Sequence, residues 1–231
     1  IGETLDRATL VNAFLPASEI EDPHRFAGRR DQIRDLADAL HVDGSIPLIL
    51  GQRGLGKSSL AVQMSRIAQG DVELLDELGL IRRAVEPEHA FITFYVNCSD
   101  ATKNLSGLLQ AMINAVEAHT VAKQSETADQ YRLVDKTTRR GLSLKFFKHE
   151  TTKRYELAKT SVDTKKFSVH EKLVHLTESL TDVYGQPVLF VVDEFDRIAP
   201  IKGLASFLKS HSSRILKFAF AGIGMNQSEL I

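Results

Sequence analysis

The sequence has no tryptophan and only one cysteine, Cys98, among its 231 residues. A lone cysteine cannot form an intrachain disulfide, so a disulfide-stapled scaffold is excluded and we expect a reducing, cytoplasmic setting. Long apolar runs are also missing. Uninterrupted aliphatic and aromatic stretches, such as residues 188–192, fall far short of the roughly 20 residues that cross a bilayer. The sequence therefore predicts no membrane helix.

An excess of charge of one sign is lacking as well, because 29 Lys and Arg residues face 30 Asp and Glu residues. The chain is 43% hydrophobic and has only six prolines, which excludes a disordered or collagen-like chain and favours a globular one. A length of 231 residues fits one domain with an elaboration. Because the sequence begins at Ile1 and ends at Ile231, we expect it to be part of a longer protein.

Short apolar segments alternate along the chain with amphipathic ones. Runs of aliphatic, aromatic and β-branched residues predict strands at 46–50, 91–96, 188–192 and 217–221. Apolar residues three and four apart predict helices at 30–43, 59–69, 71–80, 104–119, 169–183 and 201–208. Continuously apolar strands separated by helices are typical of a parallel sheet covered on both faces. The expected fold is therefore α/β, a three-layer sandwich with a mostly parallel sheet.

A glycine-rich segment joins the first predicted strand to the helix after it. It reads GQRGLGKS and fits the phosphate-loop pattern G-x-x-x-x-G-K-S. Glycines let successive backbone N–H groups point inward, and the helix N-terminus adds positive potential, so such a loop can wrap a polyphosphate. Lys57 would reach the β- and γ-phosphates, and the Ser58 hydroxyl would ligate Mg²⁺. The residues expected to contact the nucleotide are Gly51, Gln52, Arg53, Gly54, Leu55, Gly56, Lys57, Ser58 and Ser59.

Two acidic residues, Asp193 and Glu194, follow the third predicted strand. Open α/β sheets bind ligands at the carboxyl ends of their strands, so Asp193 is expected to hold the water shell of Mg²⁺. Glu194 is then placed to orient or deprotonate an attacking water as a catalytic residue, together with Lys57. Acidic residues often follow a buried strand without any function, but a phosphate loop earlier in the chain makes the catalytic interpretation stronger. The two motifs together indicate ATP hydrolysis.

The order and spacing of these motifs resemble the AAA+ superfamily and the related STAND signalling ATPases. Residues 26–32 are similar to the box that precedes the phosphate loop in replication-initiator-like ATPases of the Orc/Cdc6 type. Residues 51–58 match Walker A of that superfamily, and residues 188–194 match Walker B. The resemblance extends over nearly the whole chain, so we expect residues 1–231 to form an AAA+-like P-loop ATPase domain that is truncated.

The resemblance also implies roles for residues outside the two Walker motifs. Phe26, Gly28 and Arg29 would contribute to framing the adenine, because the box in which they lie does so in the Orc/Cdc6 type. Asn226 is the candidate for sensor 1, although small residues stand at the end of the strand, where the family usually carries a polar one. A fifth strand, an arginine finger and a helical lid with sensor 2 would follow Ile231. Homo-oligomerisation of the full-length protein is expected as well.

The segment from about 121 to 168 differs from the rest of the chain. It is polar, and we interpret it as a hairpin or a partly mobile insertion. Residues 136–166 carry ten basic and three acidic side chains, a charge of +7 against −8 for the remainder. Aromatic residues such as Phe146 and Tyr155 lie among these cations, which would suit phosphate contacts and base stacking. A solvated segment is the favoured interpretation, and a nucleic-acid or acidic protein partner is the alternative.

Three functions therefore stay open at the level of sequence. The leading one is an ATP- and Mg²⁺-dependent ATPase module that drives conformational change or assembly in a larger protein. The second is a STAND-type switch that holds ATP or ADP with little turnover. The third is a nucleic-acid-dependent ATPase that acts through residues 136–166. Cys98 lacks an evident His and Asn or Asp partner set, so we expect a packed thiol there.

Overall fold

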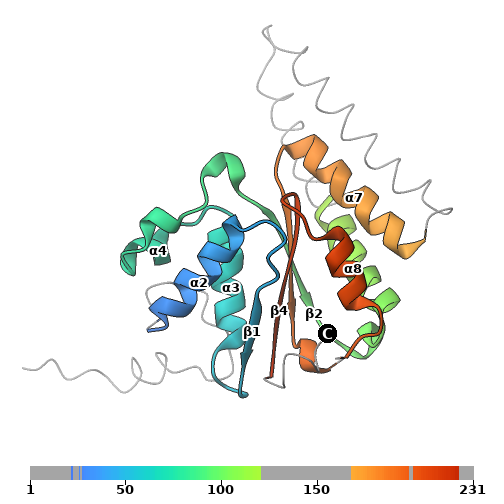
Figure 1. Cartoon of the computed structure of the whole chain (residues 1–231), viewed down its shortest axis with the longest axis horizontal. Helices are drawn as coiled ribbons and strands as arrows, with labels where there is room; N and C mark the ends of the chain where they lie inside the picture. Colours follow the sequence, from blue (N-terminus) through green and yellow to red (C-terminus); the bar gives the residue numbers. More distant parts are fainter. Residues whose placement is uncertain (1–21, 23–25, 27, 121–167, 198–199, 224–231) are drawn as a thin grey trace, which may run out of the picture.

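A four-stranded parallel sheet forms the centre of the computed structural model, which describes residues 22, 26, 28–120, 168–197 and 200–223. The strand order is β1-β4-β3-β2 (Figure 1). The strands are β1 (Leu48–Gly51), β2 (Ile92–Asn97), β3 (Val188–Asp193) and β4 (Leu216–Ile223). Phe220 of β4 is aligned with both Leu48 of β1 and Val192 of β3.

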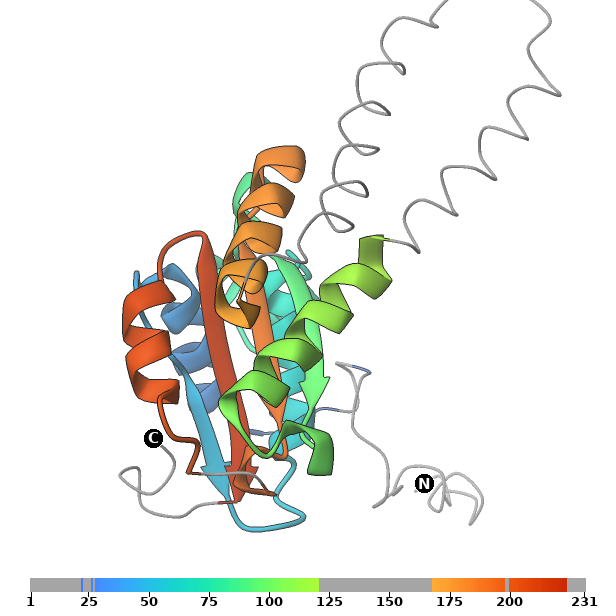
Figure 2. The same ribbon diagram turned by 90° about the vertical axis from the view of Figure 1, so that its right-hand side faces the viewer.

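Helices cover both faces of this sheet, as Figures 1 and 2 show. On one face lie α2 (Arg30–His41), α3 (Lys57–Ala68) and α4 (Glu73–Glu77). On the other lie a helix over residues 105–120, α7 (Val169–Tyr184) and α8 (Leu204–His211). Short 3₁₀ helices are η2 (Ile81–Arg83), η3 (Pro87–His89), η4 (Asp100–Thr102) and η6 (Phe195–Arg197). The predicted three-layer α/β sandwich is confirmed.

The core consists of two apolar clusters, one on each face of the sheet. In β3, Phe190 belongs to the cluster beneath α7 and α8, whereas Leu189 and Val191 belong to the cluster beneath α2 and α3. This alternation follows from the pleat of a strand, in which successive side chains point to opposite faces. Every residue of β3 is buried, which explains why its sequence is continuously apolar up to Asp193.

Some element boundaries differ from the prediction for local reasons. The first strand begins at Leu48 because Pro47 has no N–H to donate, although the Pro47 carbonyl accepts from the Phe220 amide at 2.9 Å. The predicted helix over 71–80 is wrong in length, since α4 spans only Glu73–Glu77. It ends because Gly79 adopts a φ of 64° and the Leu80 amide turns back to the Leu75 carbonyl at 2.6 Å.

Several predictions concern residues outside the described ranges. These are most of the basic segment, 121–167, and the sensor 1 candidate Asn226. Among the helices that the structure does describe, none combines the length and the apolar character that a membrane span requires.

Candidate nucleotide-binding site

The segment between β1 and α3 forms a glycine-dependent turn at the carboxyl edge of the sheet. Gly54 and Gly56 adopt φ angles of 79° and 69°, in the left-handed region that side chains with a Cβ rarely enter. The Leu55 amide donates to the Gln52 carbonyl at 3.3 Å and closes the turn. Gly56 stands at the N-cap of α3, where it offers no side chain to the first amides of the helix. Helix N-termini built in this way bind anions.

Two cationic side chains lie against the carbonyls of this loop. Lys57 Nζ donates to the Gln52 carbonyl oxygen at 3.0 Å. Arg29, at the N-cap of α2 with a left-handed φ of 57°, donates through Nη2 to the Leu55 carbonyl oxygen. A phosphate oxygen is a stronger acceptor than a carbonyl, because a charged acceptor makes a shorter and stronger bond. Both cations are therefore close enough to the loop to exchange these contacts for a polyphosphate.

A pocket of about 430 Å³ opens between α2, β1 and the loop. Its size suits a small organic ligand. The residues lining it are Arg29, Gln32, Asp35, Leu36, Leu48, Ile49, Leu50, Gly51, Leu55, Lys57 and Leu60. Of the three residues expected near the adenine, Arg29 lines this pocket, whereas Phe26 packs in the core cluster beneath α2 and α3 and Gly28 is exposed with a φ of 78°.

Asp193 ends β3 and is only 2% exposed. Its Oδ2 accepts from the Tyr95 hydroxyl at 2.6 Å, and its Oδ1 accepts from the Glu194 amide at 2.7 Å. Strand alternation puts Asp193 on the face of the sheet that α3 covers, together with Leu189 and Val191. Because all strands are parallel, Asp193 and the β1–α3 loop lie at the same edge of the sheet, with β4 between their strands (Figure 1).

Glu194 follows with an unusual backbone conformation. Its φ is 53°, and it is one of two non-glycine residues with positive φ in the described part of the chain. Such a conformation costs on the order of 1 kcal/mol for a residue with a Cβ, and it persists where the surrounding structure fixes it. The Glu194 side chain is exposed. A strained acidic residue at the carboxyl end of a central strand is typical of a functional site.

The sequence did not reveal two further polar residues at this edge. Tyr95 reaches Asp193 from the neighbouring strand β2, and Asp196 in η6 accepts from the Ile223 amide at 2.7 Å at the end of β4. Gly222 leaves room for Asp196, because a Cβ at position 222 would lie 3.0 Å from the backbone nitrogen and from Oδ1 of Asp196, so Asp196 would have to shift. The alternation of side chains along strand 92–97 allows Tyr95 to share a face of the sheet with Asp193. The sequence does not show that the two strands are neighbours, so it could not predict this contact.

The residues at this edge fit the groups that the sequence predicts. Ser58 lies in the first turn of α3 and is half-buried, and Asp193 is buried on the same face of the sheet. A hydroxyl and a carboxylate are the hard oxygen donors that Mg²⁺ prefers. The uncapped amides of α3 and the ammonium of Lys57 suit a polyphosphate. The structure thus brings Lys57, Ser58, Asp193 and Glu194 to one edge of the sheet.

No family model matches the chain, and no curated protein matches it. Among solved structures, it is similar to the ORC2 protein of Aeropyrum pernix, determined as ADPNP–ADP complexes. The identity is 15%, the TM-score is 0.47, and the similarity covers 86% of this chain and 42% of that one. The chain therefore spans less than half the length of that protein. A likeness at this level assigns neither a family nor an activity.

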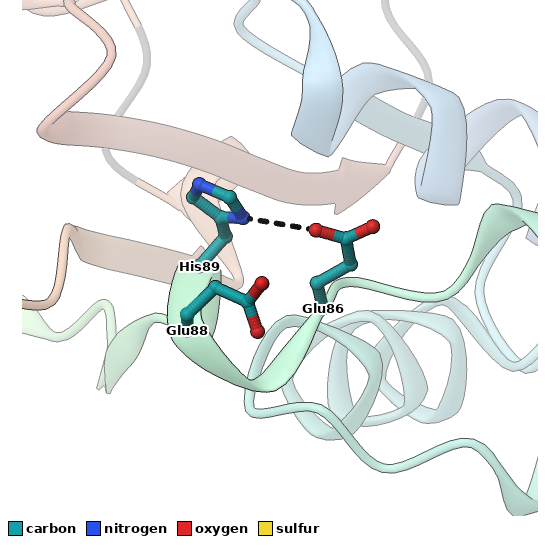
Figure 3. Close-up of side chains that lie close together, drawn as sticks. All are labelled: Glu86, Glu88 and His89. Carbon is teal, nitrogen blue, oxygen red and sulfur yellow. Dashed lines mark ion pairs between the residues drawn. The ribbon is translucent and has the colours of Figure 1, made fainter.

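A second group of polar side chains lies apart from the loop, around η3. The ligand atoms of Glu86, Glu88 and His89 lie within 4.8 Å of one another, and His89 Nδ1 is 3.5 Å from Glu86 Oε2 (Figure 3). All three residues are exposed. Exposed acidic groups gather in this way without binding a metal, so their proximity assigns them no role.

Proposed function

We propose that this chain binds ATP with Mg²⁺ at the β1–α3 loop and hydrolyses the nucleotide, driving conformational change or assembly in a larger protein. The observation that carries the proposal is the position of the buried Asp193 on the α3 face of the sheet, at the same edge as the glycine-dependent loop. A phosphate-binding loop alone would fit any phosphate ligand. A carboxylate at the same edge adds the metal ligand that nucleotide hydrolysis requires.

Each residue of the site then has a chemical task. The N-terminal amides of α3 and Lys57 bind the phosphates, and Lys57 gives up its contact with the Gln52 carbonyl to do so. Ser58 and Asp193 hold Mg²⁺, which when bound neutralises charge on the phosphate oxygens. Glu194 orients the attacking water and accepts its proton. Arg29 and the apolar residues of the 430 Å³ pocket contact the adenosine.

Two substitutions test this assignment. Lys57→Ala is expected to abolish binding of a fluorescent ATP analogue, because it removes the ammonium that would contact the β- and γ-phosphates. Glu194→Gln is expected to retain binding and to lower the rate of phosphate release at least about 100-fold, the range of a lost general base. An exposed carboxylate away from the site, Glu77, supplies the matched control Glu77→Gln. An undiminished rate in the Glu194→Gln protein would refute the catalytic role.

A nucleotide-dependent switch with little turnover is the second candidate. Its support comes from Arg29, which belongs to α2 but donates to the loop carbonyl of Leu55. A bound nucleotide that recruits Arg29 would change the contact between α2 and the loop. Single-turnover hydrolysis, together with mass measurements in ADP and in a nonhydrolysable ATP analogue, separates the two candidates. If the mass of the assembly differs between ADP and the analogue while no ATP is hydrolysed, the switch is favoured. Rapid hydrolysis of ATP favours the ATPase.

A further inference from the structure

Tyr95 and Asp193 are joined by a hydrogen bond between two neighbouring strands. The Tyr95 hydroxyl lies 2.6 Å from Asp193 Oδ2, although the residues are 98 positions apart in the chain. The Tyr95 ring is half-buried and packs against the core cluster beneath α2 and α3, so its hydroxyl is held at the edge where β3 ends. The bond is as short as hydrogen bonds from a hydroxyl to an ionised carboxylate usually are, and these are stronger than neutral ones.

The second oxygen of the same carboxylate is also held. Asp193 Oδ1 accepts from the Glu194 amide at 2.7 Å, so within the described part of the chain each oxygen of Asp193 has one donor. Rotation of the carboxylate about its Cβ–Cγ bond would break both bonds, and the group is therefore fixed in one orientation. An ionised carboxylate oxygen accepts about two hydrogen bonds, which leaves one lone pair on each oxygen for a metal ion or its water shell.

We propose that Tyr95 is a positioning residue whose hydroxyl fixes the Asp193 carboxylate toward Mg²⁺. The inference rests on the proposed function, because it assumes that Asp193 serves a metal bound with the nucleotide. Groups that orient a metal-binding carboxylate typically contribute about 10- to 100-fold to metal affinity. The two donors differ in kind. The Glu194 amide belongs to the backbone, and only proline, whose ring cannot adopt the φ of 53° found there, would remove it. The Tyr95 hydroxyl, in contrast, is replaced by hydrogen in Tyr95→Phe.

The experiment compares Tyr95→Phe with a matched control, Tyr184→Phe. Tyr184 is also half-buried, but it ends α7 on the opposite face of the sheet. A fluorescent nonhydrolysable ATP analogue is titrated into each protein in EDTA and at a series of free Mg²⁺ concentrations. In EDTA, we expect the affinity of Tyr95→Phe for the analogue to lie within about twofold of that of the unmodified chain. Mg²⁺ should strengthen binding of the analogue, and Tyr95→Phe should need about tenfold more free Mg²⁺ to reach half of that increase in affinity. Tyr184→Phe should change neither value.

Two further proteins show whether Tyr95 acts through Asp193. Asp193→Asn is expected to raise the Mg²⁺ requirement by itself, and adding Tyr95→Phe to it should produce no further change. If Asp193→Asn raises the requirement but Tyr95→Phe does not, the inference about Tyr95 is overturned and the proposed function stands. If Asp193→Asn leaves the Mg²⁺ requirement unchanged, Asp193 does not bind the metal, and both the metal role of Asp193 and the inference about Tyr95 are overturned. If Tyr95→Phe weakens binding of the analogue equally in EDTA and in Mg²⁺, the inference is overturned, because Tyr95 then supports the structure without acting on the metal.

Discussion

Gly54, Gly56 and Glu194 adopt positive φ angles within the candidate site. The two glycines belong to a pattern that the sequence makes visible, because only a residue without a Cβ enters this region at little cost. Glu194 has a Cβ, and its conformation depends on the Asp193 side chain that accepts its amide and on the turn into η6. That conformation could not be predicted from the sequence, since it follows from contacts rather than from residue type.

Cys98 is a second residue whose chemistry the surroundings decide. Burial raises the pKa of its thiol to about 12, with Asp193, Asp196 and Glu194 adding to the effect. At pH 8 the thiolate fraction of the native thiol should therefore be on the order of a thousandfold smaller than in the unfolded chain, so the native protein should react with a maleimide much more slowly. Labelling rates with and without denaturant, followed by mass spectrometry, test this. Equal rates would show that Cys98 is accessible as a thiolate, contrary to the expected packed thiol.

The same shift in pKa makes stability depend on pH. The native state holds the Cys98 proton more tightly than the unfolded chain does, because the pKa rises from 9.0 to about 12. The contribution of Cys98 to the free energy of unfolding should therefore be present below about pH 9 and decline as the pH rises toward 12. Denaturant titrations give the free energy of unfolding of the unmodified chain and of Cys98→Ala. The difference between the two free energies should become smaller as the pH rises from about 9 toward 12.

At the scale of elements, α7 begins with a reciprocal cap. Ser168 Oγ accepts from the Glu171 amide at 3.3 Å, and Glu171 Oε2 accepts from the Ser168 amide at 2.9 Å. Ser168 is the N-cap of α7 and has an extended backbone, with φ −61° and ψ 159°, so the cap fixes where the helix starts. The hydrophobic spacing predicted a helix from Val169, and the motif S-x-x-E explains why it begins there.

Replacing Ser168 by Ala should lower the free energy of unfolding by about 1 kcal/mol, the usual cost of losing such a cap. The hydrogen bonds from the Ser168 side chain and backbone lower the pKa of Glu171 below its ordinary value of 4.5. The part of the stabilisation that needs the ionised carboxylate is therefore present above pH 4.5 and is lost as the pH falls through the lowered pKa. Urea titrations at pH 7 and pH 3 should show a larger effect of Ser168→Ala at pH 7.

At the scale of the whole molecule, nucleotide binding should stabilise the fold. A ligand that binds only the native state at 100 times its dissociation constant adds about 2.7 kcal/mol to the free energy of unfolding. Because the site joins β1, α3 and β3, we expect ATP with Mg²⁺ to raise the thermal midpoint of the chain by several degrees. Lys57→Ala should abolish the shift. A shift of equal size in Lys57→Ala would mean that the nucleotide binds elsewhere.

The alternative interpretation of residues 136–166, a nucleic-acid or acidic partner, and the sensor role of Asn226 are untested, because both lie outside the described residues. Their test concerns the intact chain. If the basic segment binds nucleic acid, DNA or RNA should stimulate ATP hydrolysis, and replacement of its Lys and Arg residues by Gln should remove both the stimulation and its dependence on salt. Stimulation that survives the replacement would exclude this segment as the binding surface.

The sequence by itself determined the α/β class, the four strands and the loop at 51–58, since these depend on local hydrophobic patterns and on glycine. Only the tertiary structure decided which strands are neighbours. The order β1-β4-β3-β2 sets β2 beside β3, so that Tyr95 meets Asp193 across 98 positions of sequence. The Arg29 contact with the loop and the Asp196 contact with β4 arise in the same way. Such contacts depend on how segments far apart in the sequence pack against one another, and local sequence patterns do not predict that packing.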